Sequence, residues 1–112
     1  MDYISMQPKP EWSPLPRPGC RNVEFRVLLS HNGIAVANLR FSADAEIDEH
    51  DAPYDIEAIC LAGTGFVSVD GHTSEFSAGQ SAHWPKNTNH KLWTTASTME
   101  TLMIERIYQA SE

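Results

Sequence analysis

The sequence predicts an all-β fold in a single domain, a barrel or sandwich of short strands. About eight or nine apolar segments of strand length follow one another at nearly regular spacing, which is typical of such folds. Turn residues or polar breaks separate these segments, and none of them shows a sustained apolar stripe at the helical period. The length of 112 residues is near the usual size for one hydrophobic core.

The first two strands are expected to form a hairpin, and the next two strands are expected to be joined by a glycine turn. Segments 23–29 (VEFRVLL) and 34–41 (IAVANLRF) are rich in β-branched and apolar residues, and the Asn-Gly pair between them is a hairpin signal. Segment 56–69 (IEAICLAGTGFVSV) indicates a strand, a glycine turn and a second strand. The Asp-Gly pair that follows predicts another hairpin, into segment 72–76 (HTSEF).

Three further segments complete the expected strands: 81–85 (SAHWP), 90–95 (HKLWTT) and 99–108 (METLMIERIY). The last segment also suits a helix, because methionine, glutamate and leucine are good helix formers. We assign it as the final strand because the architecture needs a closing partner.

Residues 1–19 are expected to form a proline-rich arm, and residues 20–110 the barrel. Five prolines between Pro8 and Pro18 exclude a regular helix and favour an extended chain. Trp12 and Leu15 in this arm are expected to pack on the body of the protein or on a neighbouring subunit.

The charge balance argues against two classes of partner. Fifteen acidic and eight basic side chains give a formal net charge of −7, and the basic ones are scattered singly. Binding to nucleic acid or to an anionic membrane needs clustered Lys and Arg. Neither partner is therefore expected.

The expected location is the reducing cytoplasm. No apolar run is long enough for a spanning helix, and the N-terminal segment lacks the apolar core of a signal peptide. Cys60 lies in an apolar run and is expected to be a buried free thiol. A disulfide between Cys60 and Cys20 stays open as an alternative.

Segment 79–90 (GQSAHWPKNTNH) resembles the second sequence motif of the cupin family. In that motif a Gly is followed by five residues, a Pro, one residue, usually a Gly, two residues and a His. Gly79, Pro85, Asn87 and His90 stand at these spacings, and Asn tolerates the left-handed conformation that such loops demand. The resemblance runs over about residues 23–107 and implies a double-stranded β-helix, a barrel of the jelly-roll type.

The first cupin motif, which supplies a His-x-His pair and a Glu, is matched only in part. Counting along the motif puts Ile56 at the position of the Glu, with Glu57 next to it. Further back, His50 takes the first His position and Ala52 the second. Of the four ligands that the family offers to a metal ion, His50 and His90 remain.

The resemblance implies one divalent metal ion, Fe, Mn, Ni or Zn, held by His50, His90 and a third donor. Glu57 is the candidate, and it would reach the lumen only through a β-bulge, because neighbouring residues of a strand face opposite sides. The alternative third donors are Asp48, Glu49 and His83. Two imidazoles alone bind metal weakly, so a barrel without a metal is the alternative.

The barrel lumen is expected to be apolar, with a rim that carries polar groups. The expected pocket residues are Ile56, Ala58, Cys60, Trp84 and Tyr54. If Trp84 points inward, His83 points outward. His50 and His90 are the candidate catalytic residues. The carboxylates around His50 in the run EIDEHD are expected to raise the pKa of its imidazole.

These features predict a small cupin that binds a small organic molecule in its lumen. The resemblance implies an enzyme of the dioxygenase, isomerase, cyclase or lyase type, in which the two histidines hold a metal or transfer protons. A non-catalytic binding or sensing protein with a degraded metal site is the alternative. A homodimer is also expected, with the arm and the apolar run near the C-terminus as contact surfaces.

Overall fold

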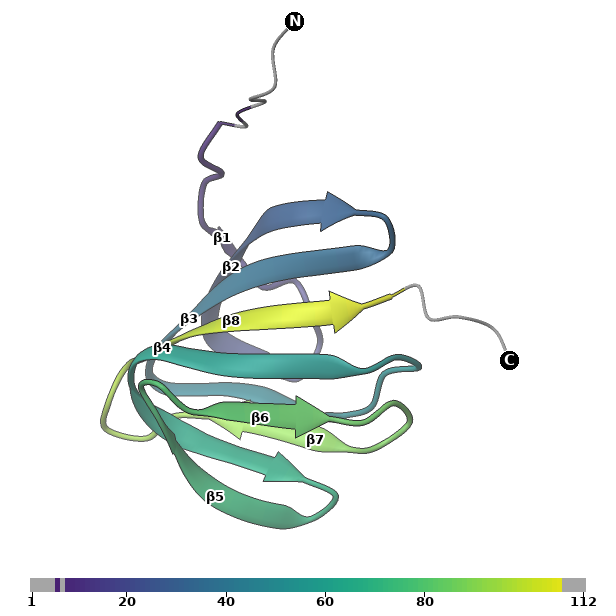
Figure 1. Cartoon of the computed structure of the whole chain (residues 1–112). Helices are drawn as coiled ribbons and strands as arrows, with labels where there is room; N and C mark the ends of the chain where they lie inside the picture. The colour runs from purple at the N-terminus through teal and green to yellow at the C-terminus, as the bar shows by residue number, and fades with distance from the viewer. Residues whose placement is uncertain (1–5, 7, 108–112) are drawn as a thin grey trace, which may run out of the picture.

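The chain is described by a computed structural model that covers residue 6 and residues 8–107. These residues form β-strands and no helix (Figure 1), which confirms the predicted all-β class. The strands are β1 (Ser13–Pro14), β2 (Cys20–His31), β3 (Ile34–His50), β4 (Ile56–Val69), β5 (His72–Ser77), β6 (Ser81–Trp84), β7 (His90–Trp93) and β8 (Met99–Arg106). The described part of the chain thus contains no helix that could cross a membrane.

Two long strands, β3 and β4, each take part in two sheets and so close the structure. Their first halves both pair with β8, and β6 pairs with the first half of β4. Their second halves both pair with β7, and β5 pairs with the second half of β4. All these pairings are antiparallel, and β2 extends the first sheet beyond β3. The result is the predicted single-domain jelly roll, with two curved sheets facing each other (Figure 1).

β4 is one continuous strand with a bend where a turn between two strands was expected. Gly63 has a positive φ of 77°, and the register between β4 and β8 shifts between Cys60 and Ala62. A bulge of this kind lets a strand turn a corner without ending. The expectation of a turn within 56–69 is therefore wrong, because the glycine bends β4 from one sheet into the other.

The two predicted hairpins are present, and their backbone angles explain them. Asn32 and Gly33 have φ values of 53° and 76°, and Asp70 and Gly71 have φ values of 52° and 80°. Positive φ at both central residues is what a type I′ turn requires, and this turn matches the twist of a hairpin. The assignment of the last segment as a strand is confirmed by β8, while Tyr108 at its expected end lies outside the described residues.

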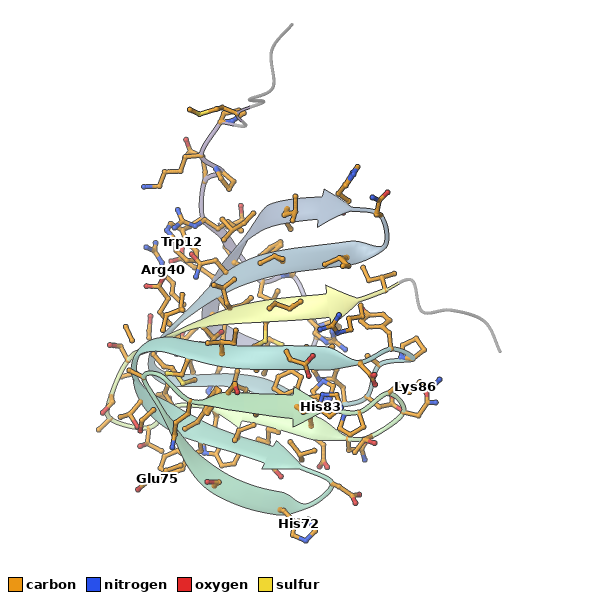
Figure 2. The ribbon with its side chains drawn as sticks, viewed as in Figure 1. Trp12, Arg40, His72, Glu75, His83 and Lys86 are labelled. Atoms are coloured by element: carbon orange, nitrogen blue, oxygen red, sulfur yellow. The ribbon has the colours of Figure 1, made fainter. Side chains whose placement is uncertain are left out.

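The proline-rich arm packs on the body of the same chain. β1 pairs with β2, and the amide of Leu15 donates a hydrogen bond to the carbonyl of Val23 at 3.0 Å. The centroid of the Trp12 ring lies 4.2 Å from the guanidinium carbon of Arg26 and 4.3 Å from that of Arg40, as expected of cation–π contacts. Figure 2 shows Trp12 and Arg40 together where the arm meets the sheet.

The hydrophobic core lies between the two sheets. Its buried members include Phe41 of β3, Ala58 of β4 and Leu92 of β7. β2 begins at Cys20; residues 1–5 and 7 of the expected arm, and 108–110 of the expected barrel, lie outside the described residues. Both cysteines are free thiols, and Cys60 is buried.

Candidate functional site

A mostly apolar cavity of about 390 Å³ lies at one end of the barrel. Its walls come from the arm, from β2 and β3, from the loop between β3 and β4, from the first residue of β4, from Trp84 at the end of β6, and from β8. The polar and charged side chains among its lining residues are Arg17, His50, Asp51, Tyr54 and Glu105. An apolar concavity with a few convergent polar groups is the usual form of a small-molecule site.

Three of the five expected pocket residues, Tyr54, Ile56 and Trp84, line this cavity. Ala58 and Cys60 do not, and the expectation for these two is wrong. They share a strand face with Ile56, but β4 runs from the cavity into the close-packed part of the barrel, where both residues are at most 1% exposed. The thiol of Cys60 donates to the carbonyl of Ala62 at 3.5 Å instead.

Several lining residues were missed because they lie outside the motifs. Ala35, Ala37 and Leu39 alternate along β3 and form one wall. Small apolar residues at every second position of a strand are a signal that could have found them. Arg17 in the arm and Glu105 in β8 also line the cavity, and the local sequence around them carries no such signal.

His50 and His90 are cross-strand neighbours at the ends of β3 and β7. The register of the two strands shifts between Ile47 and His50. Because a bulge adds a residue to one strand, Ile47 and His50 both face the cavity although they are three positions apart. The Nε2 atoms of His50 and His90 are 3.1 Å apart, and the two rings meet edge to face at 73°.

His90 is buried against Trp84 and does not line the cavity itself. The two rings stack with centroids 4.0 Å apart and an interplanar angle of 12°, and Trp84 points inward as expected, with 3% of its surface exposed. The loop before His90 is held by Asn87, whose φ is 61° and whose amide donates to the carbonyl of Ala52 at 2.7 Å. A molecule in the cavity therefore meets His50 first, and His90 through it.

The three hydrogen-bond contacts of the histidine pair need one proton more than two neutral imidazole rings carry. Nδ1 of His50 contacts the carbonyl of Asp48 at 2.8 Å, and Nδ1 of His90 contacts the carbonyl of Thr88 at 3.2 Å. A carbonyl only accepts, so each contact needs a proton on Nδ1. The contact between the two Nε2 atoms needs a third proton, whereas two neutral imidazoles hold two. The two Nε2 atoms are therefore complementary to an added proton or a metal cation.

Both histidines are neutral at pH 7. Burial lowers the pKa of His50. Burial, together with the repulsion that His50 would exert once protonated, lowers the pKa of His90 to about 4. The expectation that the neighbouring carboxylates raise the pKa of His50 is wrong, because desolvation outweighs the attraction of Asp48 and Asp51. Neutral imidazole is the form that a metal ligand or a general base requires.

Glu57 faces away from the histidine pair, so its expected role as the third metal ligand is wrong. It lies between the buried Ile56 and Ala58 on the opposite side of β4, and no register shift turns it inward. Its carboxylate pairs with His83 and, at 3.3 Å, with Arg106, and the hydrogen bond to His83 is the largest cause that lowers the pKa of Glu57. His83 is exposed on β6, as expected (Figure 2).

His50 and His90, the two remaining candidate ligands, fit two coordination positions of a divalent metal ion. The two Nε2 atoms, 3.1 Å apart, would be the protein donors to such an ion. Both Nδ1 atoms would keep their carbonyl partners, which is the usual support of a metal-bound histidine. Across residue 6 and residues 8–107, however, no three His, Cys, Asp or Glu side chains are grouped to hold a metal. A bound ion would need water or an organic molecule at its other positions.

Two β-sheets closed by shared long strands, with a cavity at one end, define the double-stranded β-helix class. A family model described as the cupin domain matches residues 39–105, which is more than half of the chain. The chain belongs to the cupin family. A search among curated proteins found no match.

Solved structures of the same fold match nearly the whole chain. The polyketide cyclase RemF from Streptomyces resistomycificus is 17% identical, with 100% of this chain and 89% of that chain covered and a TM-score of 0.82. An RmlC-like cupin from Shewanella frigidimarina is 17% identical, with 95% and 92% covered and a TM-score of 0.76. A predicted oxalate decarboxylase from Thermotoga maritima is 21% identical, with 88% and 92% covered and a TM-score of 0.77. At identities of 17% to 21%, the similarity to these structures shows the fold alone.

Proposed function

We propose that this cupin binds a small, mostly apolar organic molecule in the cavity and that the His50–His90 pair transfers a proton to or from it. The observation that carries the proposal is the meeting of two neutral Nε2 atoms at the edge of an apolar cavity. The polyketide cyclase among the structural neighbours is in keeping with an isomerase or cyclase type of reaction on such a molecule.

In this mechanism His50 is the catalytic residue and His90 is the positioning residue. Abstraction of a proton from an acidic C–H or O–H group of the bound molecule places that proton on Nε2 of His50. The proton then lies between two nitrogens 3.1 Å apart, so it supplies the missing third proton of the contact network. Return of the proton to another atom of the molecule completes an isomerisation or ring closure without a net change in the enzyme.

Filling the cavity is expected to abolish ligand binding without unfolding the protein. In Ala35→Phe the new ring enters the cavity from β3, because Ala35 is one of its lining residues. A thermal-shift screen with small aromatic and alicyclic compounds measures this, since a ligand at about 100 times its Kd adds about 2.7 kcal/mol of stability.

The matched control is Val36→Phe, which adds the same ring to the opposite face of β3. Compounds that stabilise the wild type are expected to stabilise Val36→Phe equally and Ala35→Phe not at all. Equal stabilisation of both variants would place the binding site elsewhere.

A metal-dependent form of the same function uses His50 and His90 as ligands. A divalent ion would supply Lewis-acid polarisation of a carbonyl or hydroxyl oxygen. With only two protein donors we expect weak, sub-stoichiometric binding. Elemental analysis of protein purified without chelator, beside His50→Ala and His90→Ala, checks this: a full equivalent of metal in the wild type that both variants lose would make the ion a resident cofactor.

The small number of donors also favours a second candidate function, a non-catalytic binding or sensing protein. In that case a compound stabilises the protein but returns chemically unchanged after prolonged incubation, as mass spectrometry and chirality measurements would show.

For the assembly we propose a homodimer through the apolar end of β2, where Leu28 and Leu29 are 42% and 53% exposed. Sedimentation of the full chain measures it.

A further inference from the structure

The proline-rich arm supplies part of the cavity wall, including the cationic side chain of Arg17, which is also exposed to water. Leu15 and Arg17 are lining residues of the cavity, although they precede the first long strand of the barrel. β1 holds the arm against β2, and the Trp12 ring is held by Arg26 and Arg40. The pairing of β1 before Leu15 and the start of β2 at residue 20 hold the backbone of Leu15 and Arg17 at the cavity.

The guanidinium of Arg17 has no partner among the described residues. Every other arginine in the described part of the chain has a carboxylate, amide, carbonyl or aromatic contact for its guanidinium, whereas Arg17 has neither a side-chain hydrogen bond nor an ion pair within residue 6 and residues 8–107. A guanidinium offers five N–H donors in a planar fork that matches a carboxylate. Arg17 is therefore available to a charged group of a bound molecule.

The acidic residues of the cavity do not neutralise Arg17 by direct contact. Asp51 is exposed to water, and Glu105 is partly buried. Burial raises the pKa of Glu105, while the charge of Arg17 acts in the opposite direction, which shows that the two groups lie within electrostatic reach. Neither carboxylate lies within ion-pair distance of Arg17 in the described structure.

We infer that Arg17 is the anchor for an anionic group, and that the molecule bound in the cavity is an apolar carboxylate or a comparable organic anion. The inference rests on the proposed function and specifies its substrate class. The apolar body of the molecule packs on Leu15, Ala35 and Ala37, and its carboxylate accepts hydrogen bonds from Arg17 at the arm. Arg17 and His50 line the same cavity, so a molecule anchored at Arg17 lies in the cavity that His50 faces.

A pair of probes of nearly equal shape tests this inference, 2-naphthoate and its neutral amide, 2-naphthamide. Calorimetric titration of the wild type is expected to give about tenfold tighter binding of the anion, the scale of one charge-assisted hydrogen-bonded contact at a solvent-accessible site. Arg17→Gln is expected to remove this preference by weakening the anion alone. Arg17→Lys is expected to keep part of it, because the charge remains and the fork is lost.

Arg21→Gln is the matched control, since it removes the same charge from an arginine that pairs with Asp44 and Glu46 away from the cavity. It is expected to retain the full preference. A preference that survives in Arg17→Gln, or that Arg21→Gln loses to the same extent, would overturn the anchor. Equal binding of both probes to the wild type would overturn the anchor and leave cavity binding intact, whereas binding of neither probe would overturn both.

Discussion

Replacement of Gly63 by alanine is expected to destabilise the protein by roughly 2–5 kcal/mol, the sum of about 1–3 for the overlap and about 1–2 for the left-handed backbone, a large part of the stability of a domain of this size. A Cβ atom at Gly63 would lie 2.1 Å from the carbonyl oxygen of Thr98 and 3.0 Å from Cα of Met99. Both are backbone atoms, so relief of the overlap requires β8 to move away from β4. That movement would also break the hydrogen bond from the Thr64 amide to the Thr98 carbonyl, which is 3.1 Å long.

The control for this prediction is Gly71→Ala in the hairpin between β4 and β5. Gly71 has almost the same φ, 80° against 77° at Gly63, but a Cβ atom there meets nothing within 4 Å. Its cost is limited to the left-handed backbone conformation, about 1–2 kcal/mol. Urea unfolding of both variants separates the two contributions. Equal losses of stability would mean that the approach of β4 and β8 at Gly63 is not tight.

Acidification from pH 7 to pH 4 is expected to cost up to about 3 kcal/mol of stability through the low pKa of His90, to which the neighbouring His50 contributes. Its folded-state pKa is about 4, against about 6.5 in an unfolded chain. Between these values the unfolded state binds a proton that the folded state does not bind, so the free energy of unfolding falls as the pH falls through this window. Above pH 6.5 the contribution is fully present, and each pKa unit is worth about 1.4 kcal/mol.

The measurement is the free energy of unfolding against pH, in the presence of a chelator, for the wild type, His90→Gln and His83→Gln. His90→Gln is less stable at pH 7 because it loses the stacking on Trp84, but its stability is expected to fall less between pH 6.5 and 4. His83→Gln, at an exposed position, is expected to keep the dependence on His90. Parallel curves for His90→Gln and the wild type would show that burial does not hold His90 neutral.

The fold could be predicted from the sequence because its signals are local. The Asn-Gly and Asp-Gly turns define two hairpins through the backbone conformation that they favour, and alternating apolar residues define the strands between them. The bend at Gly63 was taken for a turn, since a glycine that ends a strand and one that bends a strand look alike in sequence. Only the pairing of β8 with both β3 and β4 distinguishes them.

Half of the candidate site could be predicted in the same way. The spacing from Gly79 to His90 selected one histidine, and His50 followed by counting. The structure brings these two residues within 3.1 Å, whereas Glu57 stays on the outer face with His83. The difference is a bulge, which is present before His50 in β3 and absent at Glu57 in β4. One residue more or less in a strand reverses the direction of a side chain, and pairing with the partner strand decides it.

The sequence by itself determined the all-β class, the two hairpins, the absence of clustered basic residues and the identity of the two histidines. Each of these depends on a few neighbouring residues. The tertiary structure decided that the arm adds Arg17 to the cavity, that Ala58 and Cys60 belong to the core, and that the pKa of His50 is lowered. These properties depend on which distant segments pack together and how much water they exclude, and desolvation is a property of the packed chain.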